Sequence, residues 1–280
     1  MMTNWYPGHM AKTKRLITEK YASIDIVYEL IDARIPISSK IRGIDTLLKN
    51  KPRILIMTKY DLCDKDVTKK VGKDYESLGY NVILANLNDN NIIKEIIKVT
   101  NELMNPLQEK RKLKGLKEKE IRALVIGIPN VGKSTLINML AKRKATNVGN
   151  KPGVTQNLGW LKTNFNILLL DTPGILWPKI ESRETFLNLA SMSAIKYEIL
   201  PKDEVAVHIL IMLSTYYHHI LEERYKITKV CFDDITETYE QIGKNMGFLS
   251  KGGEIDYERV STRILDDIKN EYIKGITFDR

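Results

Sequence analysis

Short apolar runs alternate with amphipathic stretches through the first half of this 280-residue chain. Apolar runs bounded by turn residues predict buried strands, whereas apolar residues spaced three and four apart predict helices. The predicted strands are Ile24–Ile31, Arg53–Met57, Asn81–Ala85, Ile121–Ile126, Leu158–Thr163 and Asn166–Leu170. The predicted helices are Met10–Ala22, Lys65–Gly79, Asn91–Met104 and Ser134–Leu140. Because strands and helices alternate, we expect an α/β fold with a doubly wound, mostly parallel sheet.

The pattern changes near residue 181, after which no strong strand pattern remains. Helical periodicity dominates instead, at Val205–Arg224, Ile235–Met246 and Ile255–Ile273. We therefore expect an α/β domain at residues 1–178, followed by a smaller all-α domain at residues 179–280. No apolar run reaches the length of a membrane span.

Charge is distributed unevenly between these two parts. The formal net charge is +9; residues 1–180 carry 31 Lys/Arg against 17 Asp/Glu, and residues 181–280 carry 13 against 18. The basic excess therefore belongs to the α/β part, where it indicates either a polyanionic partner such as RNA or only a lysine-rich soluble surface. The charged segment 108–122 leaves the same choice open, between a solvated surface helix or linker and an RNA contact.

The beginning of the chain and its cysteines bear on its compartment. The first residues lack the apolar segment of a secretory signal. Cys63 and Cys231 have no metal-ligand spacing and favour reduced core residues. From these features we expect a cytoplasmic protein.

Residues 127–135, Gly-Ile-Pro-Asn-Val-Gly-Lys-Ser-Thr, follow a predicted strand and lead into a predicted helix. This is the context of a GxxxxGK[ST] phosphate loop, whose backbone N–H groups and helix N-terminus attract phosphates. Lys133 is expected to reach the β- and γ-phosphates, and Ser134 to ligate Mg²⁺. The loop residues predicted to contact the ligand are Asn130, Val131, Gly132, Lys133, Ser134 and Thr135. The chain is therefore predicted to bind a nucleoside triphosphate.

Two later segments fit the γ-phosphate and magnesium side of such a site. Asp171-Thr-Pro-Gly174 closes a predicted buried strand. Asp171 is expected to hold Mg²⁺ through a water, and the Gly174 N–H to face the γ-phosphate. Thr155 lies in a loop-like stretch between the phosphate loop and Asp171. It is expected to reach Mg²⁺ only when a γ-phosphate is present.

Residues 58–61, Thr-Lys-Tyr-Asp, follow another predicted strand and resemble the guanine-reading box NKxD. The Asp61 carboxylate can accept hydrogen bonds from the N1–H and the exocyclic amine of guanine, a pair that adenine does not offer. Lys59 is expected to lay its aliphatic stem along the base. Thr58 replaces the usual Asn and offers one hydroxyl in place of an amide. Ala85-Asn86, after the next strand, is expected where a backbone N–H meets guanine O6.

The order of these segments is unusual, because the base-reading box precedes the phosphate loop. In this order the chain resembles the circularly permuted GTPases, and among them the bacterial ribosome biogenesis GTPase A (YlqF/RbgA) family. The resemblance spans nearly the whole chain and rests on residues 5–10, 32–36, 127–135, 152–155 and 171–178. It implies GTP hydrolysis coupled to late assembly of the large ribosomal subunit and stimulated by the ribosome. It also implies RNA contact in part through the helical C-terminal domain, in a chain that we expect to be monomeric off the ribosome.

Hydrolysis needs a group that positions water, and Ras-type GTPases place a glutamine directly after DxxG. This chain has Ile175 there, so we expect slow hydrolysis in the absence of a partner. The family resemblance assigns catalysis to His9 once the ribosome has ordered the N-terminal segment; the alternative is an apolar tether without catalytic role. The other histidines, His208, His218 and His219, are expected to be structural or surface residues.

A potassium ion is a second candidate for completing catalysis. Resemblance to cation-dependent GTPases suggests that Asn130 helps to hold K⁺ against the phosphates. The alternative is loop geometry, since Asn tolerates unusual backbone angles.

Two other classes of function stay open at this stage. An ATP-using kinase shares the phosphate loop, although Asp61 argues against it, and nucleotide competition distinguishes the two. A nucleotide-gated RNA-binding scaffold with little hydrolysis is compatible with Ile175, and turnover with large subunits distinguishes it.

Overall fold

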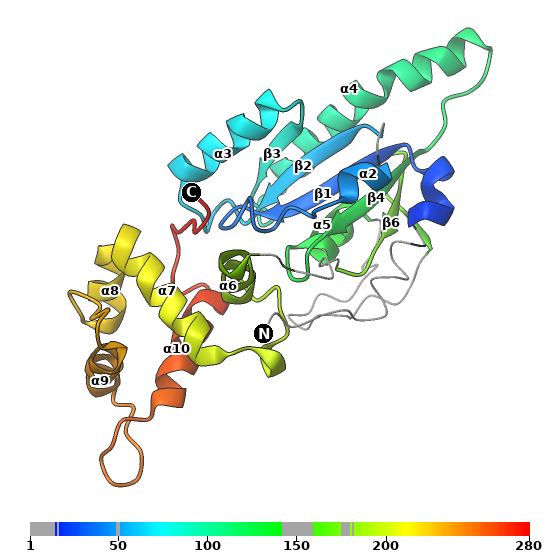
Figure 1. Cartoon of the computed structure of the whole chain (residues 1–280). Helices are drawn as coiled ribbons and strands as arrows, with labels where there is room; N and C mark the ends of the chain where they lie inside the picture. The colour runs from blue at the N-terminus through cyan, green and yellow to red at the C-terminus, as the bar shows by residue number, and fades with distance from the viewer. Residues whose placement is uncertain (1–14, 16, 49–50, 142–158, 175–179, 181) are drawn as a thin grey trace.

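A six-stranded sheet forms the larger part of the molecule in the computed structural model, which describes residues 15, 17–48, 51–141, 159–174, 180 and 182–280 (Figure 1). The strands are β1 Ile26–Asp32, β2 Arg53–Thr58, β3 Asn81–Ala85, β4 Ile121–Gly127, β5 Trp160–Lys162 and β6 Ile167–Asp171. Their order is β3-β2-β1-β4-β6-β5. Neighbouring strands are parallel except that β5 runs antiparallel to β6. The predicted α/β fold with a mostly parallel sheet is confirmed.

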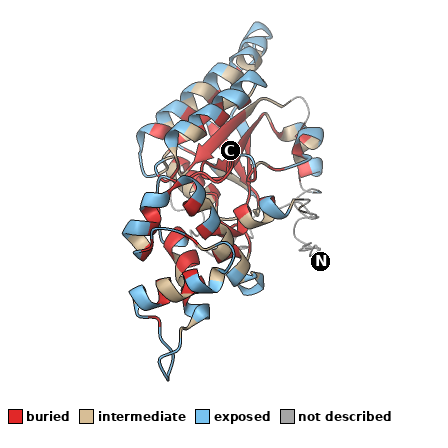
Figure 2. Cartoon of the chain, turned by 60° about the vertical axis from the view of Figure 1, so that its left-hand side comes forward, coloured by how far each residue is buried: buried red, intermediate tan, exposed pale blue. Residues whose placement is uncertain are grey.

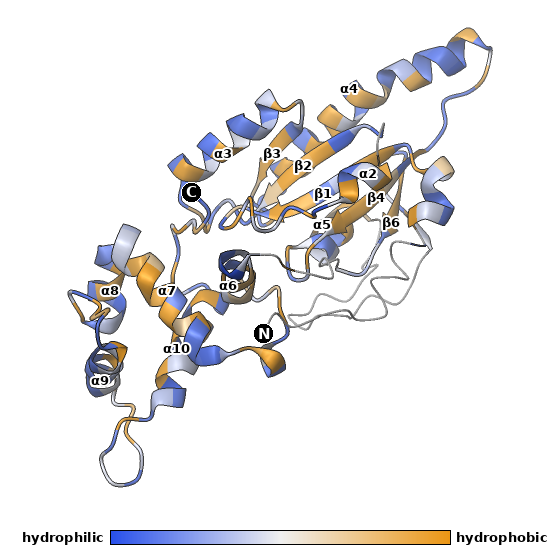
Figure 3. Ribbon diagram, in the orientation of Figure 1, coloured by the Kyte–Doolittle hydropathy of each residue, from blue (hydrophilic) through white to orange (hydrophobic). Residues whose placement is uncertain are grey.

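Helices cover both faces of this sheet. They are α2 Ile44–Leu48, α3 Lys65–Ser77, α4 Asn91–Leu113 and α5 Lys133–Leu140, preceded by the short 3₁₀ helix η1 Tyr21–Ser23. Leu55 and Met57 of β2 pack in one cluster with Tyr75 of α3, whereas Ile54 and Ile56 lie in the larger cluster that includes α4 and α5 side chains. Alternate side chains of one strand thus enter opposite layers, which explains why the strands are apolar throughout (Figures 2 and 3).

The pairing register brings the carboxyl ends of the first three strands level with one another. Asp32 of β1 pairs with Thr58 of β2, and Thr58 pairs with Ala85 of β3. Gly127, where β4 ends, lies opposite Leu30 of β1. Since ligands of open α/β sheets bind beyond the carboxyl ends of the strands, this edge is the expected place for a site.

The rest of the described chain is helical (Figure 1). Its elements are α6 Arg183–Ser191, the 3₁₀ helix η2 Tyr197–Ile199, α7 Lys202–Tyr216, α8 His218–Tyr225, α9 Ile235–Met246 and α10 Tyr257–Lys269. The segment Val205–Arg224, predicted as continuous helix, is broken at Tyr217, where φ is −140° and ψ is 47°. The Tyr217 hydroxyl accepts a hydrogen bond from the Thr277 N–H (2.8 Å), a tertiary contact that no helical periodicity records. None of the helices described here is long and apolar enough to cross a bilayer.

The last residues of the chain return to the sheet (Figure 1). The Gly275 N–H donates to the Leu62 carbonyl and the Phe278 N–H to the Arg34 carbonyl, both at 2.8 Å. The buried Asp279 carboxylate accepts the Ser38 N–H (2.5 Å) and the Ser38 hydroxyl (2.6 Å). The helical part is therefore fastened to the α/β part by the C-terminus, which the sequence pattern did not predict.

Other boundaries differ from the predictions in smaller ways. Helix α4 continues past Met104 to Leu113, so the first part of the charged segment 108–122 is helical and the rest is not. Residues 15 and 17–20 of the predicted N-terminal helix are helical, and the remainder of its first half lies outside the described residues. Cys63 is buried as expected, whereas Cys231 is partly exposed.

Candidate nucleotide-binding site

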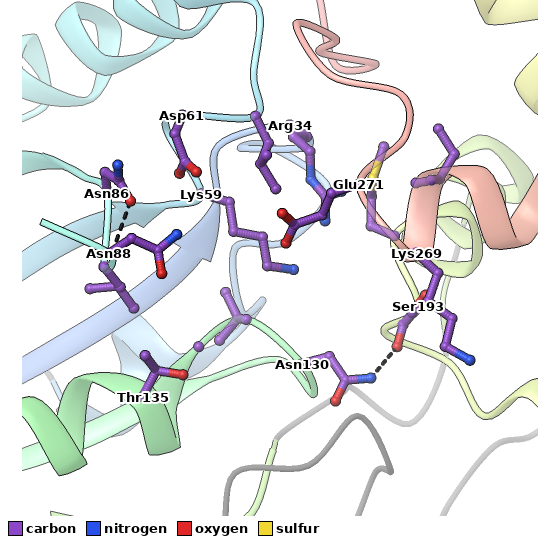
Figure 4. A pocket seen from close by; sticks show the side chains of 16 residues that line it. Arg34, Lys59, Asp61, Asn86, Asn88, Asn130, Thr135, Ser193, Lys269 and Glu271 are labelled. Carbon is purple, nitrogen blue, oxygen red and sulfur yellow. Dashed lines mark hydrogen bonds between the residues drawn. The ribbon is translucent and has the colours of Figure 1, made fainter. Parts of the chain in front are cut away.

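A pocket of ≈ 230 Å³ lies at the carboxyl edge of the sheet (Figure 4). The wall brings together residues from the sheet edge, the phosphate loop and the helical part: Arg34, Lys59, Asp61, Leu62, Asn86, Leu87, Asn88, Asn130, Val131, Gly132, Thr135, Met192, Ser193, Ile268, Lys269 and Glu271. Base-reading and phosphate-binding residues predicted from separate segments thus share one cavity.

The phosphate loop has the strand-loop-helix geometry that the sequence predicted. Gly132, with φ of 103°, caps α5, and this left-handed conformation strains any residue with a side chain. The Lys133 ammonium is buried and donates to the carbonyls of Gly127 (3.2 Å) and Ile128 (2.8 Å). Burial lowers the pKa of Lys133 to about 8, against the opposing effect of the Asp171 carboxylate. A phosphate arriving at this loop would therefore meet a desolvated lysine at the helix N-terminus.

Two glycines allow the backbone segments of the site to approach one another closely. A Cβ on Gly127 would stand 2.7 Å from the Leu30 carbonyl oxygen. A Cβ on Gly174 would stand 2.8 Å from the backbone of Pro129 in the phosphate loop. Gly174 therefore packs directly against the phosphate loop.

Asp171 and Ser134 are the described residues that fit a magnesium ion. Asp171 is 1% exposed at the end of β6, and the next residue fixes that strand end because the Thr172 hydroxyl donates to the Val125 carbonyl (2.8 Å). Ser134 directly follows the phosphate-loop lysine at the start of α5. Among the described residues no cluster of three His, Cys, Asp or Glu side chains stands ready to bind a metal. One carboxylate and one hydroxyl suit Mg²⁺, which nucleotide sites hold largely through phosphate oxygens and water.

The loop at residues 58–61, which is predicted to read the base, is organised by a buried ion cluster. Arg34 makes a bidentate pair with Asp32 (3.0 and 2.9 Å), and the Lys59 ammonium donates to the same carboxylate (2.9 Å). Burial favours the neutral acid, but the two cations hold the pKa of Asp32 well below its usual range. With its ammonium fixed by Asp32, Lys59 lays its stem along the pocket, and Asp61 lines the same cavity (Figure 4).

Thr58, Ala85 and Asn86 occupy different depths of this wall. Thr58 is fully buried, and its hydroxyl lies 2.6 Å from the Val131 carbonyl oxygen and 3.0 Å from that of Ile31. Ala85 is also fully buried, whereas Asn86 lines the pocket. Thr58 thus links the base-reading loop to the phosphate loop from behind the cavity.

Asn130 connects the phosphate loop to the helical part. Its φ of 58° is the unusual backbone angle considered above, and its side-chain nitrogen donates to the Ser193 carbonyl (2.6 Å) (Figure 4). With the amide nitrogen engaged in this way, the amide oxygen is the atom available to a cation. Loop geometry and cation binding are therefore compatible at this residue.

The remaining predicted site residues are less informative. His9, Thr155 and Ile175 lie outside the described residues. His208 bonds through Nε2 to the Asn188 side-chain oxygen (2.8 Å), and burial lowers its pKa to about 4. His218 and His219 are exposed. The described histidines therefore have structural or surface positions, as expected.

Sequence reasoning missed several residues of the site. Asp32 follows a predicted buried strand, where open α/β sheets place ligands, but its ion pairs with Arg34 and Lys59 were not predicted. Ser193, Lys269 and Glu271 line the pocket from the helical part, far from any recognised motif. No local pattern pointed to them, since only the fold brings them to the cavity.

Comparison with known proteins places the chain in a family. The family described as "50S ribosome-binding GTPase" matches residues 122–237. The ribosome biogenesis GTPase A of Bacillus licheniformis is 43% identical, with 100% of this chain and 99% of the relative covered. That of Bacillus pumilus is 42% identical with the same coverage. A crystal structure of GNP-bound YlqF from T. maritima has the same fold, with a TM-score of 0.65 at 24% identity over 96% of this chain and 98% of the other. The chain belongs to the ribosome biogenesis GTPase A family of circularly permuted GTPases.

Proposed function

We propose that this GTPase hydrolyses GTP in the cytoplasm to promote late assembly of the large ribosomal subunit, which stimulates its turnover. The observation that carries the proposal is one cavity at the carboxyl edge of the sheet, which Asp61 and the phosphate-loop residues Gly132 and Thr135 line together. Its relatives are named for ribosome biogenesis, and the matching family for binding to the 50S particle.

The described residues divide the work of binding. Asp61 accepts the guanine N1–H and amine, while Lys59 supports the base from the side. Lys133 exchanges its contacts with the loop carbonyls for phosphate oxygens. Ser134, and Asp171 through a water, would hold Mg²⁺, which would supply positive charge against the phosphates. The Gly174 N–H lies against the loop, where it meets the γ-phosphate.

Completion of catalysis falls to residues outside the described ones. Thr155 reaches Mg²⁺ in the triphosphate state, and His9 supplies the water-positioning group that Ile175 cannot. A His9→Ala variant should keep its GDP affinity and lose ribosome-stimulated turnover. Normal stimulated turnover in that variant would remove His9 from the mechanism.

The Asn130 amide oxygen would help to hold a potassium ion, which would supply positive charge against the phosphates. The support is the engagement of the amide nitrogen by Ser193, which orients the oxygen away from that carbonyl. Turnover should be faster in potassium chloride than in sodium chloride at equal ionic strength. Equal rates in the two salts would exclude this role.

Ribosomal RNA is the proposed partner of the basic surface. Exposed lysines of the segment 108–122 form no ion pair within the described part of the chain: Lys110, Lys112, Lys114 and Lys117. In the helical part, Arg224 and Arg263 both pair with Asp267, and Lys244 pairs with Glu240. These ion pairs neutralise basic side chains of the helical part, so the α/β part offers RNA the larger share of unpaired cations.

The division at residues 178 and 179 and a monomeric state off the ribosome complete the proposal. The end of the sheet at Asp171 and the start of α6 at Arg183 support the division, although the C-terminal tail crosses it.

Co-sedimentation with purified large ribosomal subunits tests whether they are the partner. The chain loaded with a non-hydrolysable GTP analogue should pellet with large subunits more than the GDP-loaded chain. Equal sedimentation with small and large subunits would contradict the proposal.

Guanine specificity separates this function from that of an ATP-using kinase. An Asp61→Asn side chain presents a donor where guanine also has donors, whereas the second carbonyl of xanthine can accept from it. The variant should therefore bind GDP more weakly and xanthosine diphosphate more tightly than wild type does. Unchanged preference for GDP would remove Asp61 from base reading.

A further inference from the structure

Glu271 is an acidic residue in a pocket that is predicted to hold a polyanionic ligand. It follows the end of α10 and lines the cavity together with Lys59 and Arg34. In Figure 4 its carboxylate points into the cavity beside the Lys59 side chain. Burial lowers the pKa of Lys59, and the negative charge of Glu271 acts in the opposite direction. The Glu271 carboxylate therefore lies near the Lys59 ammonium.

The backbone at Glu271 is strained. Its φ of 61° lies in the left-handed region that favours glycine or asparagine. The helix end needs this conformation, since the Tyr272 and Ile273 N–H groups fold back onto the Asp267 carbonyl (2.9 and 3.1 Å). A glycine would make the same turn without strain, so the glutamate costs stability at this position.

The chemistry of the cavity indicates what this carboxylate meets. Phosphates belong at Lys133 and the start of α5, and the guanine edge at Asp61. Between them a nucleotide presents its ribose, whose hydroxyl groups are neutral donors that a carboxylate can accept. Glu271 lies on the side of Lys59, away from the phosphate loop (Figure 4).

We propose that Glu271 binds the ribose hydroxyls of the guanine nucleotide, so that a residue of the helical part completes the nucleotide site. The inference rests on the guanine-nucleotide binding proposed above. Together with the Asn130–Ser193 bond, it ties the nucleotide to the helical part at two points. Nucleotide occupancy thereby stabilises one placement of α10 against the sheet.

Calorimetric titration with GDP and with 2′,3′-dideoxy-GDP tests the ribose contact in the full chain. Wild type should bind GDP about tenfold more tightly than the dideoxy analogue, the loss expected for one charge-assisted hydrogen bond. Glu271→Gln and Glu271→Gly should weaken GDP binding and bind the two nucleotides almost equally. The matched control is Glu223→Gln, an exposed acid on α8, which should behave as wild type.

Thermal unfolding of the ligand-free variants shows whether a loss of binding comes from a folding defect. Glu271→Gly should raise the unfolding midpoint by about 2–4 °C through relief of strain while it weakens GDP binding. Equal affinity of wild type for the two nucleotides, or unchanged GDP affinity in both Glu271 variants, would overturn the inference. Failure of wild type to bind GDP at all would contradict guanine-nucleotide binding itself, which is a separate result.

Discussion

Single residues in this site do more than their motifs indicate. Thr58 departs from the NKxD pattern, yet its buried hydroxyl reaches the Val131 carbonyl of the phosphate loop. Lys59 carries a left-handed backbone and an ammonium held by Asp32. Both contacts join loops that are distant in sequence, so each side chain fixes the geometry of the pocket as well as its chemistry.

Removal of the Thr58 hydroxyl tests this link. Thr58→Val preserves shape but leaves the Val131 carbonyl without that donor, which typically costs about 1–3 kcal/mol. We expect weaker GDP binding and a lower unfolding midpoint in Thr58→Val. Thr58→Ser keeps the hydroxyl and should stay close to wild type. Both quantities can be measured by calorimetry, and identical values for Thr58→Val and wild type would refute the structural role.

Lys133 gives a prediction for pH. Its pKa of about 8 in the ligand-free protein means that roughly half of the molecules lack this proton at pH 8. Bound phosphates favour the ammonium and raise the pKa, so nucleotide binding should take up about half a proton at pH 8 and almost none at pH 6.5. Titration in buffers of different ionisation enthalpy measures this uptake. Release of protons on binding, or an uptake that is the same at pH 6.5 and pH 8, would contradict the lowered pKa of Lys133.

At the scale of elements, the sequence pattern predicted most of the sheet and its helices. β3 and α9 have the predicted bounds, because a buried strand and an amphipathic helix each carry their period in local sequence. Helix α6 and the break at Tyr217 were missed. Tyr217 ends α7 because its hydroxyl bonds to the returning C-terminal tail, and such a long-range contact leaves no periodic signal.

The tail places one buried carboxylate, that of Asp279, against the α/β part. Asp279 accepts hydrogen bonds from Ile37, Ser38 and the Asn188 side chain of α6, at 2.5–2.9 Å. Asp279→Ala leaves two backbone N–H groups of the loop after β1 without this acceptor, and we expect a loss of about 2–4 kcal/mol in unfolding free energy. Urea unfolding measures the loss.

The matched control for this change is Asp233→Ala, which removes an exposed acid. It should alter the unfolding free energy by less than about 0.5 kcal/mol. An equally small effect of Asp279→Ala would show that this carboxylate contributes nothing to holding the tail against the α/β part.

At the scale of the whole molecule, the permuted order has a mechanical consequence. The segment that ends at Gly174 leads into α6, and the phosphate loop contacts Ser193 just beyond that helix. We therefore propose that ordering of the site around a γ-phosphate is passed to the helical part. The motifs and their order were readable from sequence, whereas the residues that the helical part adds to the pocket required the fold.

GTP turnover with and without purified large ribosomal subunits tests the central claim most directly. The account predicts slow turnover by the chain alone and with small subunits, because Ile175 cannot orient water. Large subunits should accelerate turnover by at least about tenfold through groups that the isolated site lacks. The same slow rate in all three conditions would contradict a ribosome-stimulated GTPase and favour a nucleotide-gated scaffold.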